Sequence, residues 1–240
     1  MKRIFYLVVL FVIYSVRASA GDGGFYLGKT RVVFPSDKRS VSLEVTNSGD
    51  KKDWLLRSWV SQYDDKDKST TPFVITPPLY RLDSNSSIQL RINSVDVSKL
   101  PADRESVFRI NVMAIPPESA AAAKPEKSNS ASGSIQFALN SRIKLFYRPE
   151  ALNTADHEKA WQKITVHEQG GNIVFDNPTP YYITLSNIKV NGTELKNTAT
   201  DTMISPKGEL KLSVSGTPKT LDYQTINDYG GMTEKRTVTF

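Results

Sequence analysis

Apolar and polar residues alternate in short segments along most of the chain, and helical periodicity is scarce. In the clearest segments the apolar residues recur at every second position: Val41, Leu43 and Val45; Ile88, Leu90 and Ile92; Phe108, Ile110 and Val112; Ile135, Phe137 and Leu139. This period of two predicts half-buried β-strands, because successive strand side chains point to opposite faces of a sheet. Turn-forming clusters at 47–50, 76–78 and 83–85 separate the segments, as is typical of an antiparallel β-sandwich.

The pattern changes at residues 148–152, where Pro149 ends strand pairing and a polar, non-alternating stretch follows as far as Trp161. Shorter alternating segments resume at Ile164. We therefore predict an all-β chain with two domains, one at 21–149 and a smaller one at 150–240, after a leader at 1–20.

The segment 135–149 contains the predicted strand that is best suited to pair with a partner. Ile135, Phe137 and Leu139 project to one face, and Lys144 follows in an apolar context. An apolar edge strand is a liability unless a partner is meant to pair with it. We interpret this segment as an edge strand that binds a partner, with the positive charge of Lys144 near its C-terminal end. The alternative is that the three apolar residues pack inside their own sandwich.

Residues 116–134 connect this strand to the preceding one and lack the apolar residues that a core requires. Ala120 to Ala123 precede a run rich in Lys, Pro, Ser, Asn and Gly. This composition predicts a mobile loop, with a brief helical turn over the alanines on binding as the alternative.

The first 20 residues have the pattern of a secretory signal peptide. Lys2 and Arg3 precede an apolar stretch from Ile4 to Val16, and Ala18-Ser19-Ala20 is a small-x-small cleavage site. We expect cleavage after Ala20 and export to the periplasm. The alternative, a membrane anchor, requires about 20 apolar residues, which is more than this stretch provides.

The charge and cysteine content exclude several partners. Lys2, Arg3 and Arg17 supply half of the formal net charge of +6, so the chain after residue 20 carries +3. The basic residues are scattered, without the clusters and stacking aromatics of a nucleic-acid surface, and no nucleotide-binding loop is present. Cysteine is absent, which excludes disulfides and thiolate metal ligands.

Catalytic residues are not expected. The chain has two histidines, His157 and His167, no nucleophile motif, and no histidine and carboxylate cluster at metal-ligand spacing. Both histidines are expected at solvated surface positions. We therefore predict a protein that is not an enzyme and that needs no metal or other cofactor.

Several separated motifs resemble one family. Residues 100–108, Leu-Pro-Ala-Asp-Arg-Glu-Ser-Val-Phe, are similar to the signature of periplasmic pilus-assembly chaperones of the chaperone/usher pathway. Six further motifs resemble the family in the correct order, two before this signature and four after it: 30–32, 76–78 with Arg81-Leu82, 114–116, 141–149, 177–182 and 226–231. The resemblance covers essentially the whole chain after residue 20.

The resemblance implies two immunoglobulin-like domains arranged as a boomerang, which bind fimbrial subunits and deliver them to an outer-membrane usher. Arg31 and Lys144 match the paired cations that anchor the carboxylate at the subunit's C-terminus. Ile135, Phe137 and Leu139 match the donor residues that enter the subunit's groove. The alternative for the two cations is that they pair with local acids.

The resemblance also implies that Glu105, Arg148 and Asp228 form a charged network between the domains. The loop at 116–134 departs from the family, because it is long but has no flanking cysteines, which leaves the type of fibre open. Self-association of the free protein through its apolar strand is possible in this scheme. The rival function is a secreted fibre subunit or adhesin built from the same sandwich.

Overall fold

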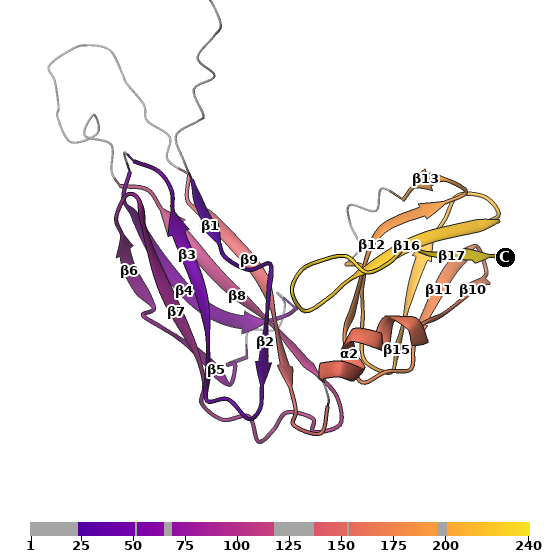
Figure 1. Cartoon of the computed structure of the whole chain (residues 1–240), viewed down its shortest axis with the longest axis horizontal. Helices are drawn as coiled ribbons and strands as arrows, with labels where there is room; N and C mark the ends of the chain where they lie inside the picture. The colour runs from indigo at the N-terminus through magenta and orange to yellow at the C-terminus, as the bar shows by residue number, and fades with distance from the viewer. Residues whose placement is uncertain (1–23, 51, 65–68, 118–136, 153, 196–200) are drawn as a thin grey trace, which may run out of the picture.

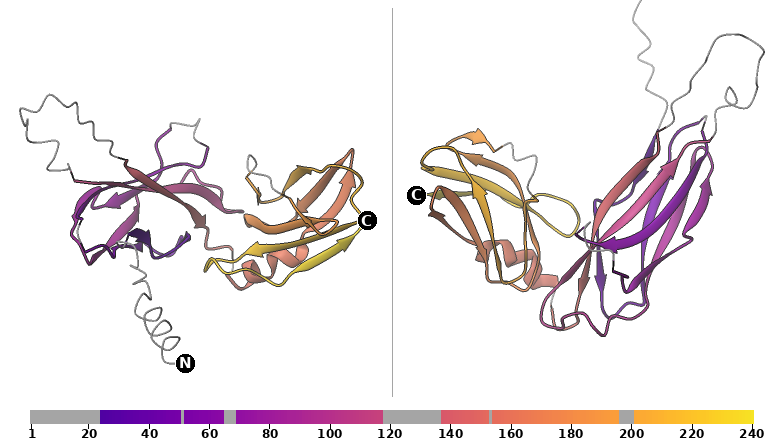
Figure 2. Two further views of the ribbon diagram at one scale, coloured as in Figure 1. Left: turned by 90° about the horizontal axis from the view of Figure 1, so that it is seen from above. Right: turned by 180° about the vertical axis from the view of Figure 1, so that it is seen from behind.

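The computed structural model describes residues 24–50, 52–64, 69–117, 137–152, 154–195 and 201–240. They form two β-sandwiches set at an angle to each other, as in a boomerang (Figure 1), and the views from above and behind show the same two units (Figure 2). The predicted all-β architecture of two immunoglobulin-like domains is confirmed. The expected leader with its cleavage site at Ala20, most of the expected loop, and Ile135 lie outside the described residues.

Two sheets form the first sandwich, with strand orders β1-β3-β7-β5 and β2-β9-β8-β4-β6. Neighbouring strands are antiparallel except β2 and β9, which are parallel. The strands are β1 (Phe25–Leu27), β2 (Arg31–Pro35), β3 (Ser40–Asn47), β4 (Trp54–Gln62), β5 (Phe73–Thr76), β6 (Leu79–Leu82), β7 (Ser86–Ser94), β8 (Ser106–Ile115) and β9 (Leu139–Arg148).

The core of the first sandwich consists of the inward-facing members of the alternating segments. Leu43, Val45, Leu90, Ile92 and Ile110 are fully buried in it. Because alternate residues face the core, the period of two correctly identified which side chains are inside.

The second sandwich has a sheet of order β10-β11-β15 and a sheet of order β13-β12-β16-β17, with β14 also paired to β12. Phe175 and Tyr223 pack edge to face at its centre. Its strands are β10 (Thr165–Gln169), β11 (Asn172–Asn177), β12 (Ile183–Val190), β13 (Thr193–Glu194), β14 (Met203–Ile204), β15 (Gly208–Ser213), β16 (Thr220–Ile226) and β17 (Arg236–Thr239).

The polar stretch after Pro149 contains helical structure that strand alternation could not indicate. Helix α2 (Thr154–Ala160) is followed by the 3₁₀ helix η1 (Trp161–Lys163). Ala160 and Ile164 are buried in the second core, so the helical segment closes one end of that sandwich.

The two sandwiches contact each other through several segments of the chain, among them the loop before β8 and the loop between β16 and β17. The Glu105 backbone N–H donates to the carbonyl of Pro180 at 3.0 Å. The loop between β16 and β17 also reaches the first sandwich (Figure 1), where Gly230 lies against Thr30. Gly230 has a φ of +85°, and a Cβ there would lie 2.4 Å from the Thr30 hydroxyl oxygen, so only glycine fits.

Candidate functional site

Strand β9 is covered by neighbours along only part of its length. Strand β8 pairs with it from Leu139 to Tyr147, whereas β2 pairs with it only from Lys144 to Arg148. Among the described residues, positions 139–143 therefore have no strand on their second side. The backbone donors and acceptors of that half form an open edge that another strand can extend.

The apolar residues of β9 emerge from the core toward this open half. Leu145 is fully buried and Ile143 packs partly against the core. Leu139 is 53% exposed, and Phe137, just before the strand, is 73% exposed. The alternative that Phe137 and Leu139 pack inside their own sandwich is wrong. An apolar row that is interrupted only by Ser141 leads from the core into solvent along the open edge.

Arg31 and Lys144 lie where the open half of β9 ends. They are register partners on β2 and β9, so both side chains leave the same face of the sheet. Arg31 is buried, and one of its Nη atoms donates to the carbonyl of Ile226 at 3.1 Å. Its Nε is buried without a hydrogen-bond partner. Burial lowers the pKa of the Arg31 guanidinium.

Lys144 has partners from the second sandwich. Its Nζ lies 3.5 Å from Asp201 Oδ1 and 3.4 Å from Thr184 Oγ1. Burial lowers its pKa, an effect that the Asp201 carboxylate opposes. Lys144 therefore pairs with an acid of its own chain, as the alternative predicted. No carboxylate of the described residues forms an ion pair with Arg31.

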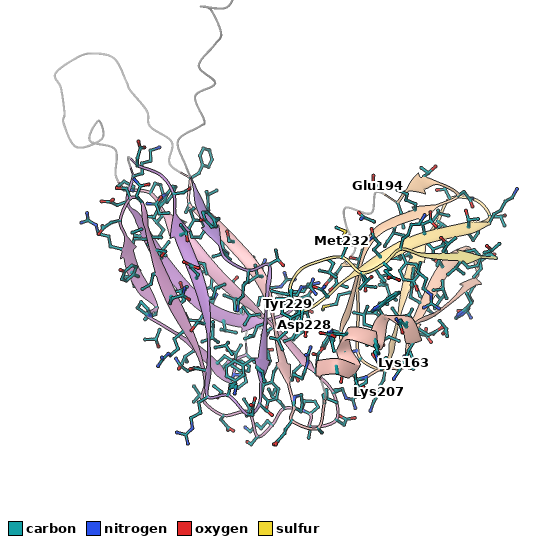
Figure 3. All side chains as sticks on the ribbon, in the orientation of Figure 1. Lys163, Glu194, Lys207, Asp228, Tyr229 and Met232 are labelled. Carbon is teal, nitrogen blue, oxygen red and sulfur yellow. The ribbon has the colours of Figure 1, made fainter. Side chains whose placement is uncertain are left out.

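A pocket of about 310 Å³ opens beside Arg31 at the junction of the domains. Lys29, Arg31 and Arg148 line it together with Asp228 and Tyr229. Tyr229 stands on the loop that crosses toward the first sandwich (Figure 3) and is 83% exposed. Arg148 and Asp228 are paired with each other, so Lys29 and Arg31 are the cations that this pocket offers to an anionic group.

Glu105, Arg148 and Asp228 meet in one ion-pair network across the domain boundary. Arg148 Nε donates to Glu105 Oε1 at 2.8 Å, and its two Nη atoms donate to the Asp228 carboxylate at 2.8 and 3.0 Å. The second oxygen of Glu105 accepts the backbone N–H of Tyr182 at 2.9 Å. Burial raises the pKa of Glu105.

His157 joins this network, which makes the expectation of a solvated surface position wrong for it. Helix α2 places its ring edge-on to Tyr181, with the Nδ1 atom 3.1 Å from Asp228 but outside hydrogen-bond geometry. Burial lowers the pKa of His157 to about 4. His167 is half exposed, as expected. The helix that buries His157 has no signal in the alternation pattern.

Tyr63, Arg109 and Asp201 also belong to the site, although no sequence motif marks them. The Tyr63 hydroxyl donates to Asp201, and burial raises the Tyr63 pKa. Arg109 Cζ lies 4.3 Å from the centre of the Tyr63 ring, and its Nε donates to the Tyr63 carbonyl at 2.7 Å. Asp201 comes from a polar stretch without periodicity, so only the folded chain connects it to Lys144.

A separate apolar surface lies on the outer face of the same sheet, near the start of β4. Leu55 is 40% and Leu79 is 57% exposed, and Leu55 is the register partner of Ile115. Pro116 and Pro117 continue the surface around a shallow groove. Exposed apolar patches of this kind are typical of protein interaction sites.

The described residues contain no cluster of three or more histidines, cysteines or carboxylates that could hold a metal ion. In the same residues, no helix has the length and apolar character needed to cross a membrane.

Two family descriptions match this chain. Residues 24–153 match the pili and flagellar-assembly chaperone, PapD N-terminal domain, and residues 159–237 match the pili assembly chaperone PapD, C-terminal domain. Chaperone protein FocC of Escherichia coli is 38% identical over 214 residues, which is 88% of each chain.

Solved structures resemble this chain over most of its length. The periplasmic chaperone SfaE is 35% identical with a TM-score of 0.72, over 90% of this chain and 100% of SfaE. The SafB chaperone of Salmonella enterica, solved in complex with SafA pilin, is 26% identical with a TM-score of 0.77, over 91% of this chain and 97% of SafB.

Proposed function

Because this chain belongs to the pili-assembly chaperone family, we propose that it holds fimbrial subunits on the open edge of β9 until they are passed to an outer-membrane usher. The chain is a pilus-assembly chaperone, as its relatives are. The rival reading as a fibre subunit or adhesin is not favoured by these relatives. Complex formation between SafB and a pilin supports fimbrial subunits as the partners of this chain.

The mode of binding that we propose is β-strand addition, for which donor-strand complementation between chaperones and pilins is an established example. The observation that carries it is the ending of the open edge at Arg31 and Lys144. A subunit strand along residues 139–143 of β9 ends against the start of β2. If its C-terminus lies at the two cations, this strand runs parallel to β9, as β2 does.

The anchor in this proposal is the pair Arg31 and Lys144, which would bind the subunit's C-terminal carboxylate. An arginine fork and an ammonium provide charge-assisted donors, which a carboxylate removed from water requires. The position of Arg31 supports this assignment, because it lines the pocket at the domain junction and its side-chain hydrogen bond goes to a backbone carbonyl, which leaves its charge without a carboxylate partner among the described residues. A fixed terminus sets the register of the whole added strand.

Phe137 and Leu139 are the proposed donor residues that the structure describes. Ile135 would continue the row, because it lies two positions before Phe137. Full burial of each large apolar side chain contributes roughly 1.5–3 kcal/mol, so Phe137 and Leu139 together supply about 3–6 kcal/mol before ordering costs. The carboxylate anchor provides register, whereas this apolar row provides much of the binding energy. The same row would allow self-association of the free protein.

The network of Glu105, Arg148 and Asp228 would fix the angle between the domains. Arg31 depends on that angle, because its guanidinium donates to Ile226 of the second sandwich. Buried ion pairs contribute little to stability compared with apolar packing, but they specify geometry. We therefore assign the network a structural role and no part in chemistry.

We assign the apolar surface around Leu55 and Leu79 to the usher. It lies at β4 and β6, on the far side of the sheet from the edge formed by β9 and β2. A chaperone that hands over its subunit needs a second contact surface that remains free while the subunit is bound. This position satisfies that requirement.

The protein would act in the periplasm, after removal of residues 1–20, by binding alone. We assign it no enzymatic activity and no cofactor. The energy for release would come from folding of the subunit with its final partner strand, since no nucleotide site is indicated by the sequence.

Co-expression with fimbrial subunits from the same genome tests the proposal. The wild-type chain should yield a one-to-one periplasmic complex, and Lys144→Ala should not. Lys211→Ala is the matched control, because Lys211 is an exposed lysine on β15 that pairs only with Glu209 among the described residues. Subunits that are stable without the chaperone, or capture that is indifferent to Lys144, would contradict the proposal.

A further inference from the structure

Lys144 is a partly buried cation among other cations. Its side chain is 20% exposed, and its register partners are Arg31 on β2 and Arg109 on β8. A partly buried ammonium beside like charges is costly unless an anion compensates it. In the proposed function a subunit carboxylate provides that compensation, but the chaperone must also fold without a subunit.

Asp201 supplies a carboxylate at this position from within the chain. Its Oδ1 lies 3.5 Å from Lys144 Nζ and accepts the backbone N–H of Met203 at 3.2 Å. Its Oδ2 accepts the hydroxyl of Tyr63, which belongs to the first sandwich and is held beneath Arg109. Donors from both domains therefore position this carboxylate toward Lys144.

We propose that Asp201 is a placeholder for the subunit's terminal carboxylate. It compensates Lys144 in the client-free chaperone and competes with the incoming carboxylate for the same ammonium. This inference rests on the proposed function of Arg31 and Lys144 as the anchor. The asymmetry between the two cations supports it, since Lys144 has an internal carboxylate and Arg31 keeps a buried donor unpartnered.

The contact is suited to exchange. A distance of 3.5 Å to a carboxylate that is 44% exposed is a weak ion pair. A subunit carboxylate that also engages Arg31 gains a second cation that Asp201 does not reach. Displacement is therefore favourable for a ligand whose carboxylate lies between the two cations.

The variant Asp201→Asn separates this role from a structural one. The asparagine side-chain oxygen can still accept the Met203 N–H, and its NH2 group can donate to the hydroxyl oxygen of Tyr63, so the variant removes the charge and keeps the shape. We expect the free chaperone to become less stable and ligand affinity to rise by about three- to tenfold, the range of a weak ion pair. A residue that merely supports the fold would lower both quantities.

Binding is measured by calorimetry with a synthetic peptide whose last residues alternate valine and threonine and that carries a free C-terminal carboxylate. The same peptide as a C-terminal amide is the second probe. Asp222→Asn is the control, because Asp222 lies on β16, pairs with Lys235 and Thr237, and gives the same change in net charge. Tighter binding of the carboxylate peptide by Asp201→Asn alone, without a matching gain for the amide, supports the placeholder role.

A second readout needs no peptide. Acylation of Lys144 by an amine-reactive ester, followed by mass spectrometry, should be faster in Asp201→Asn than in the wild type or Asp222→Asn. The placeholder role would be overturned if Asp201→Asn left the acylation rate unchanged. It would also be overturned if this variant bound the peptide no more tightly than the wild type. In both cases the anchor would stand as long as Lys144→Ala still abolishes binding. Equal binding of both peptides by wild type and Lys144→Ala would instead contradict the anchor itself.

Discussion

Arg31 and Lys144 occupy the same register position on the parallel strands β2 and β9. The side chains of both residues therefore leave the same face of the sheet, at the point where the pairing with β2 begins. A ligand strand that extends the open half of β9 must end at these two cations. The place where β2 begins to pair with β9 therefore defines the site as much as the two charges do.

The two cations are expected to matter for binding more than for folding. Arg31→Ala and Lys144→Ala should each abolish subunit capture and shift the melting temperature by no more than about 3 °C, because each removes at most a weak contact to the second sandwich. Periplasmic pull-down and thermal denaturation measure the two effects. Parallel loss of capture and stability would show a structural role for these residues.

Phe137→Glu should block subunit binding and make the free protein more soluble. Phe137 is 73% exposed in the free chain, so the substitution places a carboxylate where the proposal requires an apolar pocket of the subunit. Val74→Glu is the matched control, because Val74 is 47% exposed on β5 in the other sheet. Equal binding by Phe137→Glu and the wild type would locate the donor row elsewhere.

Arg148→Ala should lower the free energy of unfolding by about 3–5 kcal/mol, since it leaves the Glu105 carboxylate buried without its cation. The double variant Glu105→Gln with Arg148→Met should recover part of this loss, because it removes both buried charges. Denaturant titration of the three proteins provides the comparison. A double variant less stable than Arg148→Ala would mean that the network contributes more than charge compensation.

Stability should fall as the pH decreases from 6.5 toward 4, in part because of His157. Burial lowers the pKa of His157 to about 4, so below pH 6.5 the unfolded chain binds a proton that the folded chain does not. This contribution is complete above pH 6.5 and is lost on the way to pH 4, with a size on the order of 3 kcal/mol.

The variant His157→Gln isolates this effect, because Asp228, Arg148 and Arg31 face position 157 in both proteins. Its free energy of unfolding should decrease less between pH 6.5 and 4 than that of the wild type. Identical pH profiles would show that His157 is protonated in the folded chain or titrates as it does in water.

Leu55→Glu with Leu79→Glu should leave subunit capture intact and prevent fibre assembly at the cell surface. Both residues are exposed on β4 and β6, which β8 separates from β9 in the sheet, so the change should not affect folding or the anchor. Pull-down of the subunit and electron microscopy of the cells give the two readouts. Normal fibres would exclude this surface as the usher contact.

The sequence by itself determined the two sandwiches and the composition of their cores. Leu43, Val45 and Ile110 recur at every second position, and a strand places such residues on one face whatever the rest of the chain does. It also indicated Phe137 and Leu139 as exposed apolar residues, because apolar residues beside a polar loop have no core to enter.

Only the tertiary structure decided which charges meet and which edge stays open. Helix α2 buries His157 beside Asp228, and the fold of the second sandwich brings Asp201 to Lys144 and Tyr63. These residues are far apart in sequence and follow no period, so their contacts depend on the angle between the domains. The open half of β9 likewise depends on where β2 begins to pair, because edge and interior strands have the same alternation.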